Sequence, residues 1–358
     1  VLGMGEEYLG HETKLRLYDE WLDGMADDVE TSPDTVVALI DGYDVLLSSS
    51  VTQLKERFIS KESGFKHPIV FAAERSMWPD DALSLLYPPP LESNELRNGS
   101  PHPYPLQYLN SGTIVGYLWA VRLMLRVLRD EYGAVSLCGP DDQRSFHKFF
   151  LENPSLVTLD YDGILFQTLH YIAQPLIVDG SGMLYLDNAS LAVTTRTFGP
   201  TLDKWRRTPC IFHGNAGDGK DYFEMISAAW TSAIRDKSVV TVDPPGYSTG
   251  IVLFEMGDLP GARANFERSI KEEPRNALES MYNYAVLSNQ LGDNDAALSA
   301  YDECVKAKPG HIDALLNSAN IYLTRGDHDT AKRYVEIALS AHPDSALAKH
   351  YYAVVMEK

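Results

Sequence analysis

The sequence predicts an α/β domain over residues 1–242, followed by an all-α array of helical repeats over residues 247–358. In the first part, short apolar runs rich in β-branched residues alternate with amphipathic stretches, which is typical of strands and the helices that cover them. The second part repeats itself with a period of about 34 residues, as helical repeats do. The breaker cluster Asp-Pro-Pro-Gly at residues 243–246 is the predicted linker between the two.

Length and charge limit the functions that the chain can have. Its 358 residues suffice for about two domains, and 44% hydrophobic with 23% charged residues indicates a soluble, globular protein. A net charge of −19 argues against nucleic acid or an anionic membrane as a partner, whereas it suits metal cations. No apolar run reaches the ~18 residues of a membrane-spanning helix, so no transmembrane segment is predicted.

A few features bear on the compartment. The chain opens at Val1 without an initiator methionine or a basic leader, so we expect a mature or trimmed chain that has lost an upstream signal. Glycosylation sequons begin at Asn98 and Asn188, which permits the secretory pathway or the extracellular space and leaves the cytoplasm open. Cys138 and Cys210 either pair with each other or stay unpaired thiols.

Each element of the first part follows from its own pattern. Residues 35–40 and 68–73 are apolar runs that predict buried strands, and residues 50–58 between them predict a helix. Strand, helix and strand in this order indicate a parallel sheet, with functional groups at the carboxyl ends of its strands. The other predicted elements are helices at residues 14–25, 118–132 and 141–150 and a strand at residues 210–213.

The repeats are defined by residues that recur in register. Small residues let the paired helices approach closely, a Gly-Asp pair ends one helix and begins the next, and proline ends the second helix. These positions are Gly250, Ala285 and Ala319, then Gly257, Gly292 and Gly326, then Ala262, Ala297 and Ala331, then Pro274, Pro309 and Pro343. The pattern resembles the tetratricopeptide family, three repeats over residues 247–358, which implies a groove for a peptide or protein partner. Alternatively, the array supports the neighbouring domain or mediates self-association.

An acidic turn follows the first predicted strand. Asp41 and Asp44 lie in the sequence Asp-Gly-Tyr-Asp directly after residues 35–40. Carboxylates suit a hard divalent cation, which can bridge the phosphates of a nucleotide and neutralise the charge of a departing diphosphate. Aspartates at strand ends also commonly cap turns, so the pair alone leaves both interpretations open.

Further motifs occur in a fixed order along residues 1–225. They are Val1-Leu2-Gly3-Met4-Gly5-Glu6-Glu7, Leu39-Ile40-Asp41-Gly42-Tyr43-Asp44, Phe71-Ala72-Ala73-Glu74 with Trp78-Pro79-Asp80, Tyr108-Leu109-Asn110-Ser111-Gly112, Asp141-Asp142-Gln143, Leu159-Asp160 with Ile164-Leu165-Phe166-Gln167, and His213-Gly214-Asn215 with Lys220. Together they resemble the glycosyltransferase domain of the procollagen lysyl hydroxylases and its stand-alone relatives. The resemblance implies a GT-A fold, Rossmann-like and nucleotide-sugar-binding, that uses a UDP-sugar with manganese and retains the anomeric configuration.

The resemblance also implies roles for individual residues. Asp41, Asp44 and His213 match the metal ligands, although a histidine at a strand end can equally be a structural one. Asn215 and Lys220 match the loop on the diphosphate side, where a lysine offsets the charge of the released group.

Two matched residues have open alternatives. Lys14 matches a basic residue beside the nucleotide, with a solvated helix charge as the alternative. Trp78 matches a tryptophan at the sugar cleft, where an aromatic face suits sugar C–H surfaces. The alternative for Trp78 is a plain core position.

Three matched residues are catalytic candidates. Asp141 and Asp142 match an acidic pair near the sugar and the acceptor, and their alternative role is to complement the N-terminal end of a helix dipole. Asn110 lies in the matched Leu-Asn-Ser-Gly segment, which we expect to be a turn, and would hydrogen-bond donor or acceptor hydroxyls.

The sequence departs from the family at several points. The family places a nucleotide-binding strand before the segment that opens here at Val1. The family's Glu-Glu-Trp is Glu6-Glu7-Tyr8 in this sequence, and the glycine-rich stretch that usually follows is shortened to residues 10–13. The segment at residues 88–105 is longer and richer in proline than in the family.

Two hypotheses for the function follow. The first is a hexosyltransferase that acts on a hydroxyl of a protein or glycoprotein acceptor, with the repeats binding a protein partner. The second is an inactive glycosyltransferase-like scaffold that docks through its repeats.

Overall fold

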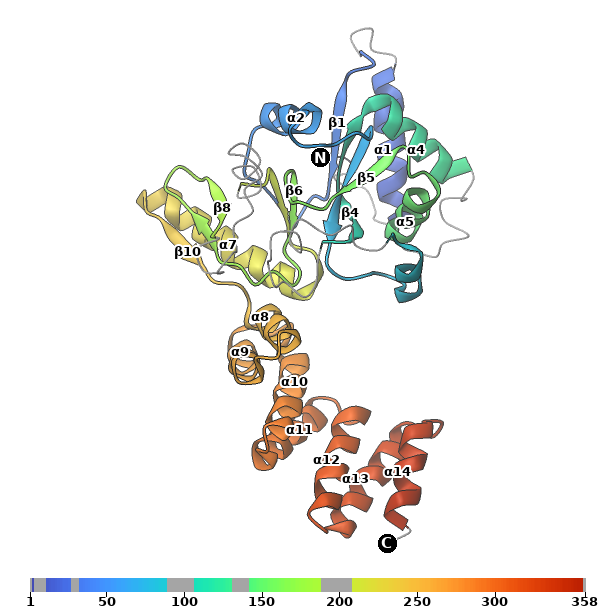
Figure 1. Ribbon diagram of the computed structural model, residues 1–358, viewed down its shortest axis with the longest axis vertical. Coiled ribbons are helices and arrows are strands. Elements are labelled where there is room, and N and C mark those ends of the chain that lie inside the picture. Colours follow the sequence, from blue (N-terminus) through green and yellow to red (C-terminus); the bar gives the residue numbers. More distant parts are fainter. Residues whose placement is uncertain are drawn as a thin grey trace. The chain divides into compact units, whose positions relative to one another are not determined.

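A four-stranded sheet is the frame of the N-terminal part of the computed structural model (Figure 1). Its strands lie in the order β1-β4-β3-β5. Their bounds are Val36–Ile40 for β1, Ile69–Glu74 for β3, Tyr108–Tyr117 for β4 and Val157–Asp160 for β5. The structure describes Leu2 and residues 11–26, 32–88, 106–130, 142–187 and 208–356, and every structural statement here concerns these residues.

The sheet is mixed, which corrects the prediction of a parallel sheet. Strands β1 and β3 do not pair with each other, because β4 lies between them and runs antiparallel to both. Only β3 and β5 pair in parallel within this sheet. The predicted strands at residues 35–40 and 68–73 are confirmed, but the pairing between strands depends on β4, which comes much later in the chain.

Helices cover the sheet on both faces. Helices α1 (His11–Ala26), α4 (Leu118–Asp130) and α5 (Asp142–Glu152) pack on one face, and α2 (Val51–Ile59) packs on the other (Figure 1). The strands alternate accordingly: Val37 and Leu39 of β1 point into the first core, and their neighbours in β1 point into the second. All four helices were predicted from the sequence, and residues 131, 132 and 141 of those predictions lie outside the described residues.

Two smaller sheets complete this part of the chain. One has the order β2-β9-β6 and the other the order β10-β7-β8. The first consists of β2 (Val45–Leu47), β9 (Ile211–His213) and β6 (Phe166–Thr168), and the second of β10 (Val240–Val242), β7 (Leu176–Val178) and β8 (Leu184–Leu186). Helix α7 (Ala216–Asp236) packs against both through a shared core that includes Tyr222 and Ile226. A short 3₁₀ helix, η1, spans Asp81–Leu86.

Strand β4 contains a bulge next to the candidate site. Phe71 and Ala72 are neighbours in β3, yet they pair with Ile114 and Asn110 of β4. Residues 111–113 of β4 therefore have no partner in β3, while Thr113 pairs with Ile40 of β1. The predicted turn at Asn110 is wrong, because this segment is a bulged strand.

The contacts divide the chain into two units, residues 1–244 and 245–358. The second unit consists of helices, three pairs followed by one more. The pairs are α8 (Gly246–Glu255) with α9 (Leu259–Glu272), α10 (Ala277–Gln290) with α11 (Asn294–Ala307), and α12 (Ile312–Thr324) with α13 (His328–Ala341), and the last helix is α14 (Ala346–Met356). None of the described helices is long and apolar enough to cross a membrane.

The recurring residues of the repeats have the predicted roles. Each of the three glycines between paired helices adopts a positive φ, 82° at Gly257, 83° at Gly292 and 78° at Gly326. The aspartate that follows each glycine caps the next helix, as Asp258 does by accepting a hydrogen bond from Gly261 N. Gly250 lies against the ring of Phe266, where a Cβ atom would come within 2.8 Å of the ring. Close helix packing therefore requires the small residue.

Candidate metal centre

The two aspartates of the acidic turn are held by the ends of two strands. Asp41 follows β1 directly, and its backbone N–H donates to Gly112 O in the bulge of β4 at 2.8 Å. Asp44 precedes β2, and its backbone oxygen accepts from Gly214 N at 2.8 Å. Backbone hydrogen bonds thus tie both ends of the turn to strands that come from distant parts of the chain.

His213 joins this turn because β9 pairs with β2. The register places His213 opposite Val45, the residue after Asp44. Its Nε2 atom lies 3.7 Å from Asp41 Oδ2 and 3.6 Å from Asp44 Oδ1. One ligand atom from each of the three residues lies within 4.8 Å of the others.

These spacings fit one shared cation. Two ligand atoms that bind the same ion through bonds of about 2.0–2.6 Å lie at most roughly 5 Å apart. Two carboxylates and one imidazole form a donor set that suits divalent ions such as manganese. Asp41, Asp44 and His213 would hold the ion, and the chemistry that it would supply is neutralisation of charge on a bound diphosphate.

The charges around Asp44 favour its ionised form. Partial burial raises the pKa of Asp44, but the hydrogen bond and charge of His213 and the charge of Lys220 outweigh it, so that the pKa lies below its usual value. Lys220 is in the first turns of α7, and its Nζ atom lies 3.7 Å from Asp44 Oδ2. The lysine side chain is 53% exposed, so it can also reach a bound anion.

Lys14 of α1 lies inside the candidate site. Its Nζ atom is 2.7 Å from Asp41 Oδ1 and 2.9 Å from Asp142 Oδ2. Burial lowers the pKa of Lys14, but Asp142 and Asp41 outweigh it and hold the pKa well above its usual value. The alternative of a solvated helix charge is therefore wrong for this lysine, whose side chain is only 15% exposed.

The structure describes Asp142 of the acidic pair Asp141-Asp142 at the start of α5. Asp142 is the first residue of α5 and is buried, with its carboxylate against Lys14. Asp141 lies outside the described residues, as do Cys138 and the two sequons. The carboxylates of Asp142 and Asp41 contact the same lysine, Lys14, which connects α5 to the acidic turn.

Both polar atoms of the Asn110 side-chain amide have hydrogen-bond partners within the protein. Its Oδ1 atom lies 2.9 Å from His213 Nδ1 and accepts from Gly112 N at 3.0 Å. Its Nδ2 atom donates to Glu74 Oε2 at 3.3 Å. Asn110 is thus adjacent to the candidate metal ligands, and its amide is bonded within the protein.

Asn215 is held in a similar way. It lies at the start of α7, where its Oδ1 atom accepts from the backbone of Leu169 at 3.0 Å and of His170 at 3.1 Å. Its Nδ2 atom donates to Glu74 Oε2 at 2.7 Å. Asn215 therefore fixes the loop after β6 against the N-terminus of α7.

Glu74 is the central residue that the sequence analysis did not single out. The buried carboxylate ends β3 and accepts hydrogen bonds from the amides of Asn110, Asn215 and Gln143, the last at 2.5 Å. Burial raises the pKa of Glu74, and the three amide bonds oppose that rise. The signal was present in the sequence, because Glu74 follows a buried strand just as Asp41 does.

A second missed group is a histidine–aspartate pair. His170 Nδ1 lies 2.5 Å from Asp218 Oδ1, and Asp218 also accepts from Tyr171 N at 3.0 Å. Asp218 is buried in the first turn of α7. The two residues are far apart in sequence, so no local pattern could have joined them.

Trp78 is exposed, which excludes the alternative of a core position. The residue is 62% exposed, while its backbone oxygen accepts from Gln143 Nε2 at 3.1 Å and lies 2.7 Å from His147 Nε2. Gln143 also donates to Glu74, so the Trp78 backbone is connected to the same hydrogen-bonded network. Trp78 is therefore an exposed residue next to this network.

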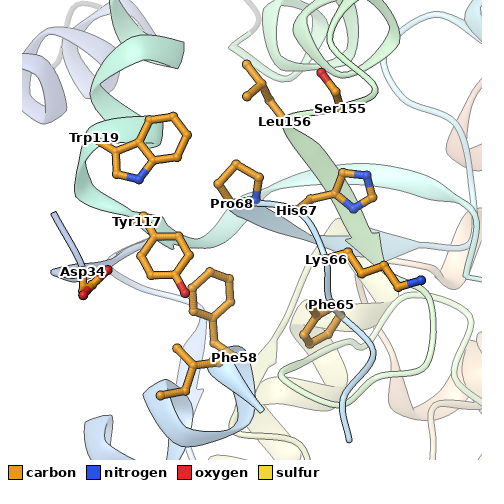
Figure 2. A pocket seen from close by; sticks show the side chains of 11 residues that line it. Asp34, Phe58, Phe65, Lys66, His67, Pro68, Tyr117, Trp119, Ser155 and Leu156 are labelled. Carbon is orange, nitrogen blue, oxygen red and sulfur yellow. The ribbon is translucent and has the colours of Figure 1, made fainter. Parts of the chain in front are cut away.

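A pocket of about 520 Å³ lies at the opposite edge of the main sheet (Figure 2). The residues that line it include Asp34, Pro68 and Leu156, which precede β1, β3 and β5, and Tyr117, which ends β4. Asp41 and Glu74 lie at the other ends of β1 and β3. The pocket is therefore separate from the candidate metal centre.

Comparison with known families agrees with the resemblance read from the sequence. Residues 1–227 match the family model described as the PLOD GT domain. The chain belongs to the PLOD GT domain family. Residues 247–312 and 288–353 each match a tetratricopeptide repeat model, so the PLOD GT domain is followed by tetratricopeptide repeats.

Several curated proteins are similar to this PLOD GT domain chain. A procollagen-lysine,2-oxoglutarate 5-dioxygenase of Drosophila melanogaster is 29% identical over 55% of this chain and 29% of its own length. The multifunctional procollagen lysine hydroxylase and glycosyltransferase LH3 of Rattus norvegicus is 26% identical over 48% of this chain and 21% of its own length. The chain thus spans less than a third of these relatives. Among solved structures, the first tetratricopeptide domain of Spaghetti (RPAP3) bound to an HSP90 peptide is 15% identical, with a TM-score of 0.29, over 31% of this chain and 88% of that one.

Proposed function

We propose that this chain is a metal-dependent glycosyltransferase of the GT-A type that moves a hexose from a UDP-sugar to a hydroxyl of a protein or glycan acceptor. The observation that carries the proposal is the convergence of Asp41, Asp44 and His213, whose ligand atoms lie within 4.8 Å of one another. Membership of the PLOD GT domain family supports it, because the similar protein LH3 of Rattus norvegicus is by name a glycosyltransferase.

The surroundings of the acidic turn fit a diphosphate. Helix α7 is 21 residues long and begins beside Asp44, so its N-terminal N–H groups favour an anion there. Lys220 on the same helix supplies a positive charge that faces Asp44. In the proposed reaction the acceptor oxygen bonds to the anomeric carbon, the bond from that carbon to the diphosphate oxygen breaks, and the hydroxyl proton is released. Lys220 would offset the charge on the departing diphosphate.

Other residues would bind the sugar. Asp142 and Asp141, the latter outside the described residues, would lie near the sugar and the acceptor, and the ring of the exposed Trp78 would pack against a sugar face. Asp142 already forms an ion pair with Lys14, which holds its carboxylate in place. We also propose that the tetratricopeptide repeats bind a protein partner and that the chain works in the secretory pathway.

Calorimetric titration with UDP, with and without manganese, tests the proposal. We expect UDP binding that requires manganese in the parent chain and is lost in Asp44→Ala, because the variant lacks one of the three ligands. Asp34→Ala is the matched control, since Asp34 is an exposed aspartate that precedes the same strand whose other end carries Asp41. The control should bind UDP as the parent does.

A negative result in the UDP titration would favour the second hypothesis, an inactive scaffold. If the parent chain binds neither manganese nor UDP while it is folded, the transferase proposal is wrong. The chain would then be a glycosyltransferase-like scaffold that docks through its repeats into a larger assembly.

A further inference from the structure

The amide of Asn110 has one orientation that suits all its neighbours. Its Oδ1 atom receives Gly112 N at 3.0 Å, and its Nδ2 atom faces Glu74 Oε2 at 3.3 Å. Turning the amide over would place its NH₂ group against the Gly112 N–H and its oxygen against a carboxylate oxygen. Two attractions would become two repulsions, so the oxygen of Asn110 is the atom that faces His213.

This orientation decides which nitrogen of His213 carries the hydrogen. Asn110 Oδ1 lies 2.9 Å from His213 Nδ1 and can only accept a hydrogen bond, so Nδ1 is the donor. A neutral imidazole with its hydrogen on Nδ1 has the lone pair on Nε2. Nε2 is the atom that lies 3.7 Å from Asp41 Oδ2 and 3.6 Å from Asp44 Oδ1.

Glu74 in turn fixes Asn110. Glu74 is 4% exposed, and its carboxylate accepts hydrogen bonds from the amides of Asn110, Asn215 and Gln143. A carboxylate offers acceptors, so the NH₂ group of Asn110 must point towards it and the oxygen must point away, towards His213.

The absence of a side chain at Gly112 leaves the space that the imidazole ring of His213 occupies. A Cβ atom on Gly112 would lie 2.2 Å from His213 Cε1, so the ring packs directly against bare backbone. The backbone oxygen of Gly112 also accepts from Asp41 N, which ties the same bulge to a second candidate ligand. The ring of His213 is therefore held both by packing and by a directed hydrogen bond.

We propose that Glu74 and Asn110 are positioning residues that hold His213 in its Nδ1–H tautomer and so present the Nε2 lone pair to a cation. The inference rests on the proposed function, because it gives His213 the role of a metal ligand. Partners that orient a metal-binding histidine typically change metal affinity by about 10–100-fold when they are removed. Asn110 would therefore act through His213 rather than on the substrate.

The tautomer can be read in the parent chain without any metal. Nitrogen-15 NMR of histidine-labelled protein distinguishes a protonated ring nitrogen from an unprotonated one, and a His213→Gln variant identifies the signals of His213 among the ten histidines. We expect the hydrogen on Nδ1. Nε2 faces the carboxylates of Asp41 and Asp44, so it can also carry a hydrogen while no metal is bound. An Nδ1 without a hydrogen in the folded, metal-free parent chain overturns the inference.

Variants of Asn110 separate positioning from a structural role. Asn110→Leu keeps the size of the side chain but offers no acceptor, so we expect the Nδ1–H preference to be lost and manganese affinity to fall about 10–100-fold. Asn110→Asp keeps an acceptor and should keep the Nδ1–H tautomer. Asn153→Ala is the control, since the side chain of Asn153 donates locally to Phe149 O in the same unit and should change neither readout. An unchanged tautomer in Asn110→Leu would also overturn the inference.

The same experiments distinguish this inference from the proposed function. If manganese alone, titrated into the parent chain, does not bind while His213 is in the Nδ1–H form, the proposed function fails and the positioning role stands. If manganese binds but Nδ1 of His213 carries no hydrogen in the metal-free chain, the positioning role fails and the metal site stands.

Discussion

At the scale of single residues, the candidate site is a set of charges that compensate one another. Lys14 lies between Asp41 and Asp142, and Lys220 lies against Asp44. Without these two lysines, the carboxylates would repel each other in a partly buried place, which is costly. The lysines therefore allow several carboxylates to gather here even before a cation binds.

A buried aspartate outside the acidic turn gives a prediction about pH. Asp160 ends β5 and accepts from the backbone N–H groups of Ile164, Leu165 and Phe166. Complete burial raises the pKa of Asp160 to about 6, although these three hydrogen bonds oppose the rise. Because the folded pKa exceeds the unfolded value of 3.8, folding favours the protonated form, and this carboxyl destabilises the fold increasingly as pH rises from about 4 to about 6.

We therefore expect the stability of the parent chain relative to Asp160→Asn to decrease by about 2 kcal/mol between about pH 4 and pH 7. Urea unfolding followed by tryptophan fluorescence measures it, since all five tryptophans lie in the first unit. A difference between the two proteins that stays constant with pH would contradict the raised pKa.

At the scale of elements, local patterns predicted the strands and helices, whereas pairing between strands was not accessible. The runs at residues 35–40 and 68–73 are apolar whatever lies beside them, so they predicted β1 and β3. The insertion of β4 between them depends on contacts between distant segments, which no local pattern contains. The same limit applies to the site. Asp41, Asp44 and His213 could be named by resemblance, but the role of Glu74 as a common acceptor depends on three amides from separate segments.

The helix caps of the repeats give a prediction at this scale. Asp258 caps α9 by accepting from Gly261 N at 3.0 Å, so Asp258→Ala removes that acceptor. We expect the second unit to lose about 1 kcal/mol of stability, and Asp258→Asn to lose less because it keeps an oxygen at the cap. Circular dichroism of the helices during urea unfolding measures the change. Equal losses in the two variants would show that the cap bond is not the cause.

At the scale of the whole molecule, the chain consists of two units with separate cores. The apolar clusters of the repeats contain residues of the second unit alone, and the clusters around the sheets contain residues of the first alone. Stacked repeats bury their apolar faces against their immediate neighbours in sequence. Among the described residues, each unit therefore has an apolar core of its own.

We predict that residues 245–358, produced alone, fold into a helical protein that unfolds cooperatively. The physical reason is that α8 to α14 bury their small and aromatic residues against one another. Circular dichroism and thermal melting of the fragment test this. A fragment without helical signal would mean that the first unit supplies contacts that the repeats require.

The bulge in β4 decides which side chains of that strand face which side of the sheet. Leu109 and Ile114 both point into the core beneath α1 and α4, although they are five residues apart. Strict alternation along a strand would place two such residues on opposite faces, so the unpaired residues 111–113 absorb the difference. Asn110, next to Leu109, is thereby placed on the face where it reaches His213. In a regular strand that kept Ile114 buried, the leucine and the asparagine would exchange faces, and the histidine would lose its neighbour.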